Sequence, residues 1–179
     1  MKKEEKQFLY SICEEIMPDI FHRPPVRKED SFALMVTSGE SISPPQISEI
    51  RERTGLSPVF ITCSLESELD VSRRYARALG SRLFLPRSAM AVVEILSSCN
   101  FSICESEESA ILSISARVPA YLSASSAPCR SFAAQLFAKG ISGEVIIPYT
   151  KNRTGAISMR QPQEKDFSRA IELLRAVIF

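Results

Sequence analysis

The sequence has no surplus of charge of either sign. It carries 22 Lys and Arg residues against 21 Asp and Glu residues, so the net charge near neutral pH is +1. A chain with this balance has no long-range field that would attract nucleic acid or an anionic membrane. We therefore expect no nucleic acid among its partners.

Long apolar runs are missing as well. No segment approaches the roughly 20 consecutive apolar residues that a membrane-spanning helix needs. The first six residues are mostly charged, and the short mixed run after them lacks the apolar stretch and the small-residue cleavage site of a secretory signal. These absences predict a cytoplasmic protein without a membrane span.

Histidine is nearly absent, and cysteine occurs without a regular spacing. His22 is the only histidine, and it precedes Pro24 and Pro25 in a connector, so a serine hydrolase would have only a solvated candidate base. The cysteines form an odd set without a C-x-x-C pair, namely Cys13, Cys63, Cys99, Cys104 and Cys129. Because free cysteine packs as a small hydrophobe, we predict five reduced core thiols and no bound metal.

Nucleotide-binding fingerprints are also lacking. The segment 37–43 contains a single glycine, Gly39, where a dinucleotide-binding G-x-G-x-x-G turn needs three. No P-loop occurs anywhere in the chain. We therefore predict no cofactor.

What the sequence does contain is an unbroken alternation of short apolar segments and segments of helical period. Strands are predicted at residues 32–37, 58–63, 82–85, 100–104, 120–123 and 144–148, with helices at 45–54, 66–79, 89–98, 107–117 and 128–139. The first strand is apolar nearly throughout, which indicates a parallel sheet covered on both faces. The pattern predicts a single α/β domain with a doubly wound, Rossmann-like sheet of about six parallel strands in the order 3-2-1-4-5-6.

The two ends of the chain flank this core. Residues 1–30 read as an N-terminal helix, at 4–21, followed by a proline-rich connector. The Rossmann-like core then occupies residues 31–149, and residues 150–179 form a polar loop and a final helix at 162–177. Ile171, Leu174 and Ile178 give the final helix an apolar stripe that we expect to pack against the sheet.

An open parallel sheet binds ligands outside the carboxyl ends of its strands, where the strand order reverses. The predicted order places that crevice between residues 38–41 and 104–109, with 123–129 beside them. The candidate ligand-binding residues are Ser38, Gly39, Glu40, Ser106, Glu108, Ser125, Ser126 and Arg130. Hydroxyls and backbone amides near helix starts can hold an anion such as a phosphate or a nucleotide. The same residue types also serve as helix N-caps and turn residues without any ligand.

Three carboxylates, Glu105, Glu107 and Glu108, follow the fourth predicted strand. Carboxylates so placed can act as acid and base, or hold a divalent cation. The alternative is structural, because the helix macrodipole favours acidic residues in a first turn.

The segment 100–123 contains a hydrophobic strand, a turn, a helix of small residues, Val118-Pro119 and a further strand. The order of these features resembles the signature region of the polysaccharide pyruvyl transferase family, and the two align without a gap. The family's pattern has Arg-x-His in the turn and Gly-Val-Pro before the second strand. The segment 125–136 is similar to the family's Tyr-Asp-Pro-Lys segment and the helix after it. The resemblance covers residues 32–149, roughly the C-terminal half of a member, and implies a glycosyltransferase-B-like fold and a transferase of cell-surface polysaccharide.

The chain departs from the family at its cationic positions. Ser106 and Glu108 stand at the Arg-x-His positions, and Arg117 stands at the glycine of Gly-Val-Pro. The lysine of the family's Tyr-Asp-Pro-Lys segment aligns with Pro128, or with Cys129 after a shift of one residue. The family transfers an enolpyruvyl-derived group from phosphoenolpyruvate to a sugar, and a cationic pair suits that trianionic donor. The resemblance thus implies a degenerate binding or accessory half, with catalytic residues unassigned.

Two other hypotheses stay open. In the first, the chain is an active transferase with a sugar acceptor and a phosphoenolpyruvate or nucleotide-sugar donor, and Ser106, Glu108 and Arg130 surround the crevice. Alternatively, it is an interaction module that self-associates through its N-terminal helix. The corresponding partners are an anionic small molecule (phosphoenolpyruvate, a nucleotide or a nucleotide sugar), a partner chain that supplies the missing half, or a second copy.

Overall fold

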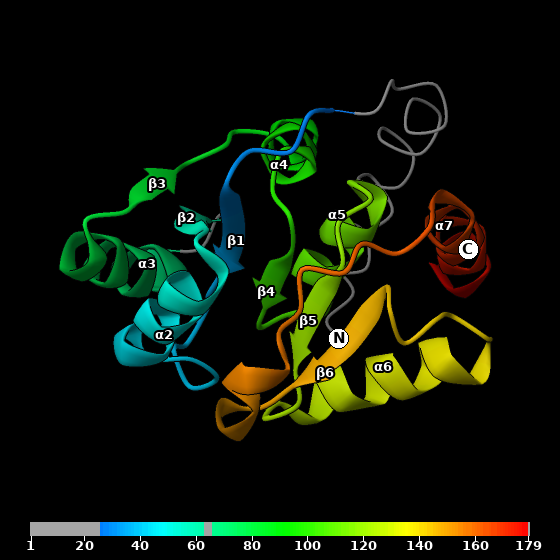
Figure 1. Cartoon of the computed structure of the whole chain (residues 1–179). Helices are drawn as coiled ribbons and strands as arrows, with labels where there is room; N and C mark the ends of the chain where they lie inside the picture. The colour runs from blue at the N-terminus through cyan, green and yellow to red at the C-terminus, as the bar shows by residue number, and fades with distance from the viewer. Residues whose placement is uncertain (1–25, 63–65, 179) are drawn as a thin grey trace.

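A six-stranded parallel sheet forms the centre of the structure, a computed structural model that describes residues 26–62 and 66–178 (Figure 1). Its strands are β1 (Ser31–Met35), β2 (Ser57–Ile61), β3 (Arg82–Phe84), β4 (Ser102–Cys104), β5 (Ala120–Ser123) and β6 (Ile146–Tyr149). They lie in the order β3-β2-β1-β4-β5-β6, and every neighbouring pair is parallel. The predicted fold class and strand order are confirmed.

Helices cover both faces of the sheet. They are α2 (Pro44–Thr54), α3 (Glu66–Leu79), α4 (Ala89–Ser97), α5 (Glu107–Ser115), α6 (Ala127–Ala138) and α7 (Glu164–Ile178), with a 3₁₀ segment, η1, at Lys151–Ala156. Buried residues of α2 and α3, together with Ile157 directly after η1, pack on one face of the sheet. Buried residues of α4, α5, α6 and α7 pack on the other face. Right-handed crossovers impose this division, because α4 connects β3 to β4 across the point where the strand order reverses.

Residues of β1 alternate between the two hydrophobic clusters. Phe32 and Leu34 belong to the cluster under α2 and α3, whereas Ala33 and Met35 belong to the cluster under α4 to α7. None of these four side chains is more than 3% exposed. The apolar run of the first strand is therefore explained by burial on both faces, as the sequence predicted.

The element boundaries differ from the prediction in a few places. The predicted fourth strand began at residue 100, but β4 begins at Ser102, and the predicted sixth strand began at residue 144, in what is a turn before β6. The polar segment after β6 forms η1 rather than an irregular loop. Helix α7 begins at Glu164 rather than at 162, and it packs through Ile171 and Leu174 as expected.

Several predictions fall outside the described residues. The N-terminal helix at 4–21, His22, Cys13 and Cys63 belong to this group. Cys99, Cys104 and Cys129 are free and buried. In the part of the chain that the structure describes, no helix is both long and apolar enough to cross a lipid bilayer.

Candidate functional site

Three loops meet at the carboxyl ends of β1, β4 and β5, where the strand order reverses. The loop after β1 donates hydrogen bonds to Glu105, which directly follows β4. Ser41 of the same loop bonds to Ser123, the last residue of β5. The structure therefore brings together the three segments that the sequence placed around the crevice.

The carboxylate of Glu105 is the centre of this arrangement. Its Oε2 accepts hydrogen bonds from the backbone N–H groups of Thr37, Ser38 and Gly39 at 2.8, 2.8 and 3.1 Å. Its Oε1 accepts one from the N–H of Ser41 at 3.0 Å. The hydroxyls of Thr37 and Ser38 lie 3.3 Å from Oε2 and donate to it as well. Glu105 is only 7% exposed, so these donors replace water almost completely.

This environment keeps Glu105 ionised. Burial alone would raise the pKa of the carboxyl, but the hydrogen bonds from the backbone N–H groups of Ser38, Ser41, Thr37 and Gly39 favour the charged form, and the pKa lies below its usual value. A general acid or base needs a pKa near the operating pH. Glu105 therefore serves as a structural anion, and the hypothesis that it acts as acid or base loses its support.

Gly39 allows the loop to close around the carboxylate. Its φ is +72°, in the left-handed region that glycine favours. A Cβ at this position would lie 2.6 Å from the hydroxyl oxygen of Tyr75, which donates a hydrogen bond to the Gly39 carbonyl at 3.3 Å. The conformation and the close approach of α3 both require glycine here.

A second contact connects the same loop to β5. The hydroxyls of Ser41 and Ser123 are 2.5 Å apart, and both side chains are buried. Ser123 Oγ also accepts a hydrogen bond from the backbone N–H of Ser125 at 3.2 Å. The carboxyl ends of three strands are thus joined by polar contacts within the chain.

The remaining predicted site residues serve local structure. Ser106 and Ser126 are the N-caps of α5 and α6, where their hydroxyls accept from the N–H groups of Ser109 and Cys129. Glu108 lies in the first turn of α5, as the macrodipole favours. Arg130 is exposed, and its Nη1 donates to the carbonyls of Ala124 and Ser125 at 2.7 and 3.0 Å. Glu40 is exposed, and its backbone N–H donates to Ser38 Oγ.

Neither a reactive thiol nor a metal site is found among these residues. The Sγ of Cys129 donates to the Glu105 carbonyl at 3.4 Å, and burial, together with nearby carboxylates, raises the pKa of this thiol. Over residues 26–62 and 66–178, no three His, Cys, Asp or Glu side chains are grouped so that they could hold a metal ion. The idea that Glu105 holds a cation with Glu107 and Glu108 is unsupported, because the Glu105 oxygens already face hydrogen-bond donors.

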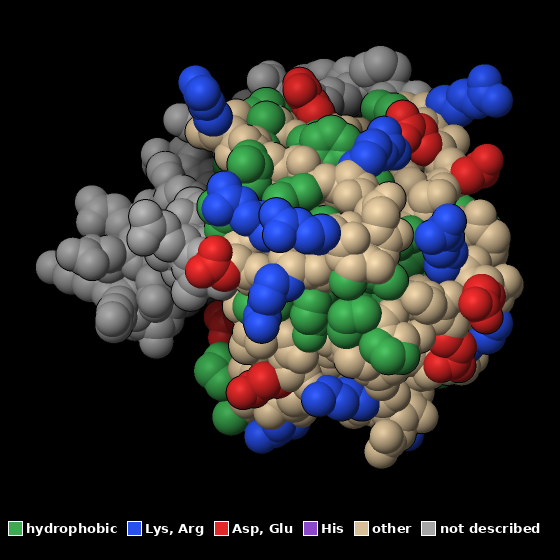
Figure 2. Space-filling model, turned by 90° about the vertical axis from the view of Figure 1, so that its left-hand side faces the viewer, with side chains coloured by type: hydrophobic (Ala, Val, Ile, Leu, Met, Phe, Trp, Pro, Cys, Tyr) green, Lys and Arg blue, Asp and Glu red, His purple; other side chains and the backbone are tan. Residues whose placement is uncertain are grey.

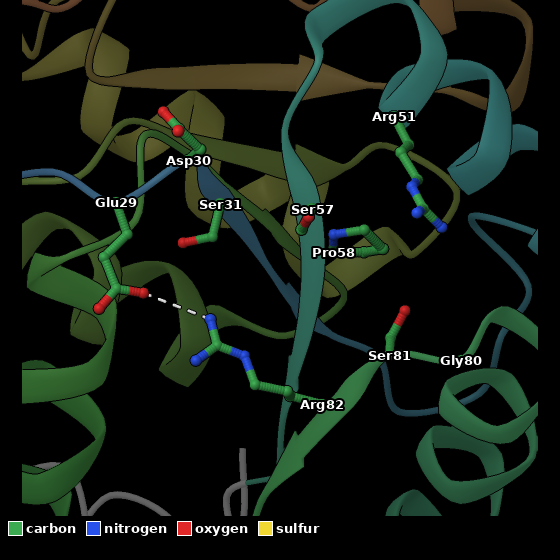
Figure 3. Close-up of a pocket in the computed structure, with 9 residues that line it drawn as sticks. All are labelled: Glu29, Asp30, Ser31, Arg51, Ser57, Pro58, Gly80, Ser81 and Arg82. Carbon is green, nitrogen blue, oxygen red and sulfur yellow. Dashed lines mark hydrogen bonds and ion pairs between the residues drawn. The ribbon is translucent and has the colours of Figure 1, made fainter.

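The opposite side of the sheet, where the strands have their amino ends, is called the amino edge, and the side where they have their carboxyl ends is called the carboxyl edge. The amino edge contains a hollow of about 290 Å³ that the sequence did not indicate. Figure 3 shows Arg51 and Ser81 on one side of it, and Glu29 and Arg82, joined by an ion pair, on the other. The complete lining consists of Glu29, Asp30, Ser31, Arg51, Ser57, Pro58, Gly80, Ser81 and Arg82. A neighbouring hollow of about 330 Å³ shares Glu29, Ser31 and Arg82 with it.

The charges of the amino-edge hollow balance, because two arginines face two carboxylates. Helices α2 and α3 both end at this edge, and their terminal carbonyls attract cations in the absence of any ligand. Arg51 lies in the last turn of α2, where that attraction explains it. Lys and Arg side chains are interspersed with Asp and Glu over the face shown in Figure 2. The charged residues of this hollow therefore give no preference for an anionic or a cationic ligand.

Comparisons with known protein families, with curated proteins and with solved structures found no match to this chain.

Proposed function

We propose that this chain is a polysaccharide pyruvyl transferase-like domain without transferase activity of its own, which serves as a binding or accessory half. The single observation that carries the proposal is the occupation of the crevice by Glu105. Four backbone N–H groups that would be free to hold a donor's phosphate or carboxylate already bind this side chain. A crevice whose N–H groups already bind a side chain of the same chain has few hydrogen-bond donors left for an anionic substrate such as phosphoenolpyruvate.

The backbone of Arg117 supports the alignment with the family. Arg117 stands where the resembling family has the glycine of Gly-Val-Pro, and its φ is +56°. Among the described residues, no other non-glycine residue has a positive φ. Because L-residues adopt this region at a cost and glycine does not, the conformation fits a position that once held glycine.

The electrostatics of the α5 N-terminus support the loss of activity. Ser106 and Glu108, at the positions of the family's Arg and His, bring no cation to the crevice. Phosphoenolpyruvate carries a phosphate and a carboxylate, which Glu108 would repel. Arg130, the cation that an active transferase could still use, donates from Nη1 to two carbonyls of the loop between β5 and α6. These contacts favour an accessory domain over an active transferase with a phosphoenolpyruvate or nucleotide-sugar donor.

Calorimetric titration with phosphoenolpyruvate tests the proposal. We expect no tight binding by the natural chain and stronger binding by the double variant Ser106→Arg with Glu108→His. Each restored charge-assisted contact is worth roughly 1.5 to 3 kcal/mol, which corresponds to at least a tenfold gain in affinity. Tight binding by the natural chain would show that the crevice still holds an anionic substrate, and it would remove the observation that carries the proposal.

The double variant needs a matched control, because Ser106 is also a helix N-cap. Loss of this cap costs about 1 kcal/mol of stability by itself. Ser106→Ala removes the cap without adding a cation, so it should lose the same stability and gain no affinity. If the double variant folds as well as Ser106→Ala and still binds no better, the alignment of Ser106 and Glu108 with Arg-x-His is wrong.

A further inference from the structure

The loop at residues 37–41 is a set of hydrogen-bond donors built around one carboxylate. Four backbone N–H groups and two hydroxyls converge on the oxygens of Glu105, within 2.8 to 3.3 Å. Consecutive N–H groups that point into one concavity are a recurrent way for proteins to bind anions. The acceptor is 64 to 68 residues away in the sequence, so the contact is tertiary and is not part of a local turn.

Contacts that do not involve Glu105 also shape this loop. Tyr75 of α3 bonds to the Gly39 carbonyl, and the left-handed φ of Gly39 turns the chain. The hydroxyl of Ser41 bonds to that of Ser123, and the backbone N–H of Glu40 bonds to Ser38 Oγ. Because none of these contacts uses the Glu105 side chain, we expect the donors to keep much of their arrangement when that side chain is shortened.

We propose that residues 37–41 form a carboxylate-binding nest that Glu105 fills within the chain, and that a small free carboxylate binds there when this side chain is removed. Three N–H groups of the nest donate hydrogen bonds to Oε2 of Glu105, and one donates to Oε1. That division suits the two oxygens of a planar carboxylate. Replacement of Glu105 by alanine would remove two carbon atoms and the carboxyl oxygens, a space that matches formate or acetate rather than phosphate. The inference does not depend on the proposed pyruvyl transferase relationship.

Chemical rescue of the full chain carrying Glu105→Ala tests the proposal. Its thermal midpoint is measured in sodium chloride, formate, acetate and phosphate at matched ionic strength and neutral pH. We expect a midpoint on the order of 10 °C below that of the natural chain in chloride, because several buried donors lose their acceptor. We expect formate at 0.1 M to raise this midpoint by about 3 to 6 °C, as a dissociation constant of about 10 mM requires.

Two matched variants isolate the nest. Glu40→Ala removes an exposed carboxylate from the same loop, and Glu105→Gln keeps the nest filled by a side chain of equal size. Neither midpoint should respond to formate more than to chloride. The natural chain should not respond either, because its nest is occupied.

Each outcome decides the proposal. A selective response of Glu105→Ala to formate or acetate supports it. If that variant is unfolded in chloride, folding in formate supports the proposal in the same way. The proposal is overturned if Glu105→Ala stays unfolded in every salt, if its response to formate does not exceed that of the two control variants, or if phosphate stabilises it more than formate does.

Discussion

The two edges of the sheet use charge in opposite ways. At the carboxyl edge, one carboxylate, Glu105, is buried and accepts hydrogen bonds from four backbone N–H groups. At the amino edge, Glu29 and Arg82 form an ion pair at 3.3 Å, with more than half of each side chain exposed beside an open hollow. A buried anion of this kind is costly to disturb, whereas water largely screens an exposed ion pair.

Fold class alone does not locate a binding site in this chain. Ligands of doubly wound folds bind at the carboxyl edge because loop amides and helix N-termini are free there. Here the chain itself satisfies those amides, and an open hollow lies at the other edge, beside the first residues of β1, β2 and β3. Five expected outcomes, ordered from the largest effect to the smallest, test this difference between the two edges.

The largest effect is expected for Glu105→Gln. The amide keeps the size of the side chain, but it loses the charge and directs an NH₂ group at backbone donors. We expect a loss of about 3 to 5 kcal/mol in the free energy of unfolding at pH 7, because charge-assisted bonds are lost and buried donors are unpaired. Urea titration followed by circular dichroism measures it. A loss below 1 kcal/mol would show that the nest contributes little.

We also expect the stability difference between the natural chain and Glu105→Gln to depend on pH. Since the folded-state pKa of Glu105 is depressed, its stabilisation is fully present above the unfolded-state pKa, near 4.5, and is lost as the pH falls through the folded-state pKa. The difference in unfolding free energy between the natural chain and Glu105→Gln should stay constant from pH 7 to about 5.5 and decrease below about 4.5. A difference that changes above pH 6 would contradict this assignment.

The next largest effect is expected for Gly39→Ala at the carboxyl edge, with Gly55→Ala as the control. Both glycines have a φ of +72°, but a Cβ at Gly55 meets nothing within 4 Å, whereas at Gly39 it meets Tyr75. Gly55→Ala should cost about 1 kcal/mol for the left-handed conformation alone. Gly39→Ala should cost about 2 to 3 kcal/mol, because the overpacked contact adds to the same strain. Equal losses in urea titration would show that Tyr75 moves aside freely.

A smaller effect, of opposite sign, is expected for Arg117→Gly, between α5 and β5. Glycine relieves the positive φ at this position, and the change also removes an ion pair with Glu164 on α7. We expect a net gain of about 0.5 kcal/mol in the free energy of unfolding, since relief of strain exceeds the value of an ion pair whose partner is mostly exposed. Glu164→Ala measures the ion pair separately. A net loss larger than that of Glu164→Ala would mean that the backbone is not strained there.

The smallest effect is expected at the amino-edge ion pair. A double-mutant cycle of Glu29→Ala and Arg82→Ala should give a coupling energy of roughly 0 to 0.5 kcal/mol, which falls further in 0.5 M salt. The variant proteins should melt within about 2 °C of the natural chain. A coupling energy above 1 kcal/mol would remove the contrast between the two edges.

The sequence predicted more about the fold than about the site. Alternating strand and helix patterns were sufficient for the strand order, because crossover handedness leaves few arrangements. The caps at Ser106 and Ser126 follow from residue type and position, and both serines are N-caps in the structure. The turn before β6 and the 3₁₀ segment η1 were missed, because short apolar and polar stretches do not define boundaries.

Glu105 illustrates why the site itself could not be predicted. In the sequence it is one of three neighbouring glutamates, and nothing local distinguishes it from Glu107 or Glu108. The useful signal was its position directly after β4, at the reversal of strand order, together with the single glycine of the loop after β1. That signal indicates adjacency, but it does not say whether the loop amides face a ligand or a side chain.

Periodicity, crossover handedness and residue type can be read along the chain. They were enough to predict the class of the fold, the order of the strands, the caps of α5 and α6, and the absence of a nucleotide fingerprint. The closure of the loop after β1 on Glu105, and the open hollow at the amino edge, became visible only in the folded chain. The first outcome depends on a contact between residues 67 apart in the sequence, and the second brings together residues up to 53 apart. The packing of the helices on the sheet sets these distances.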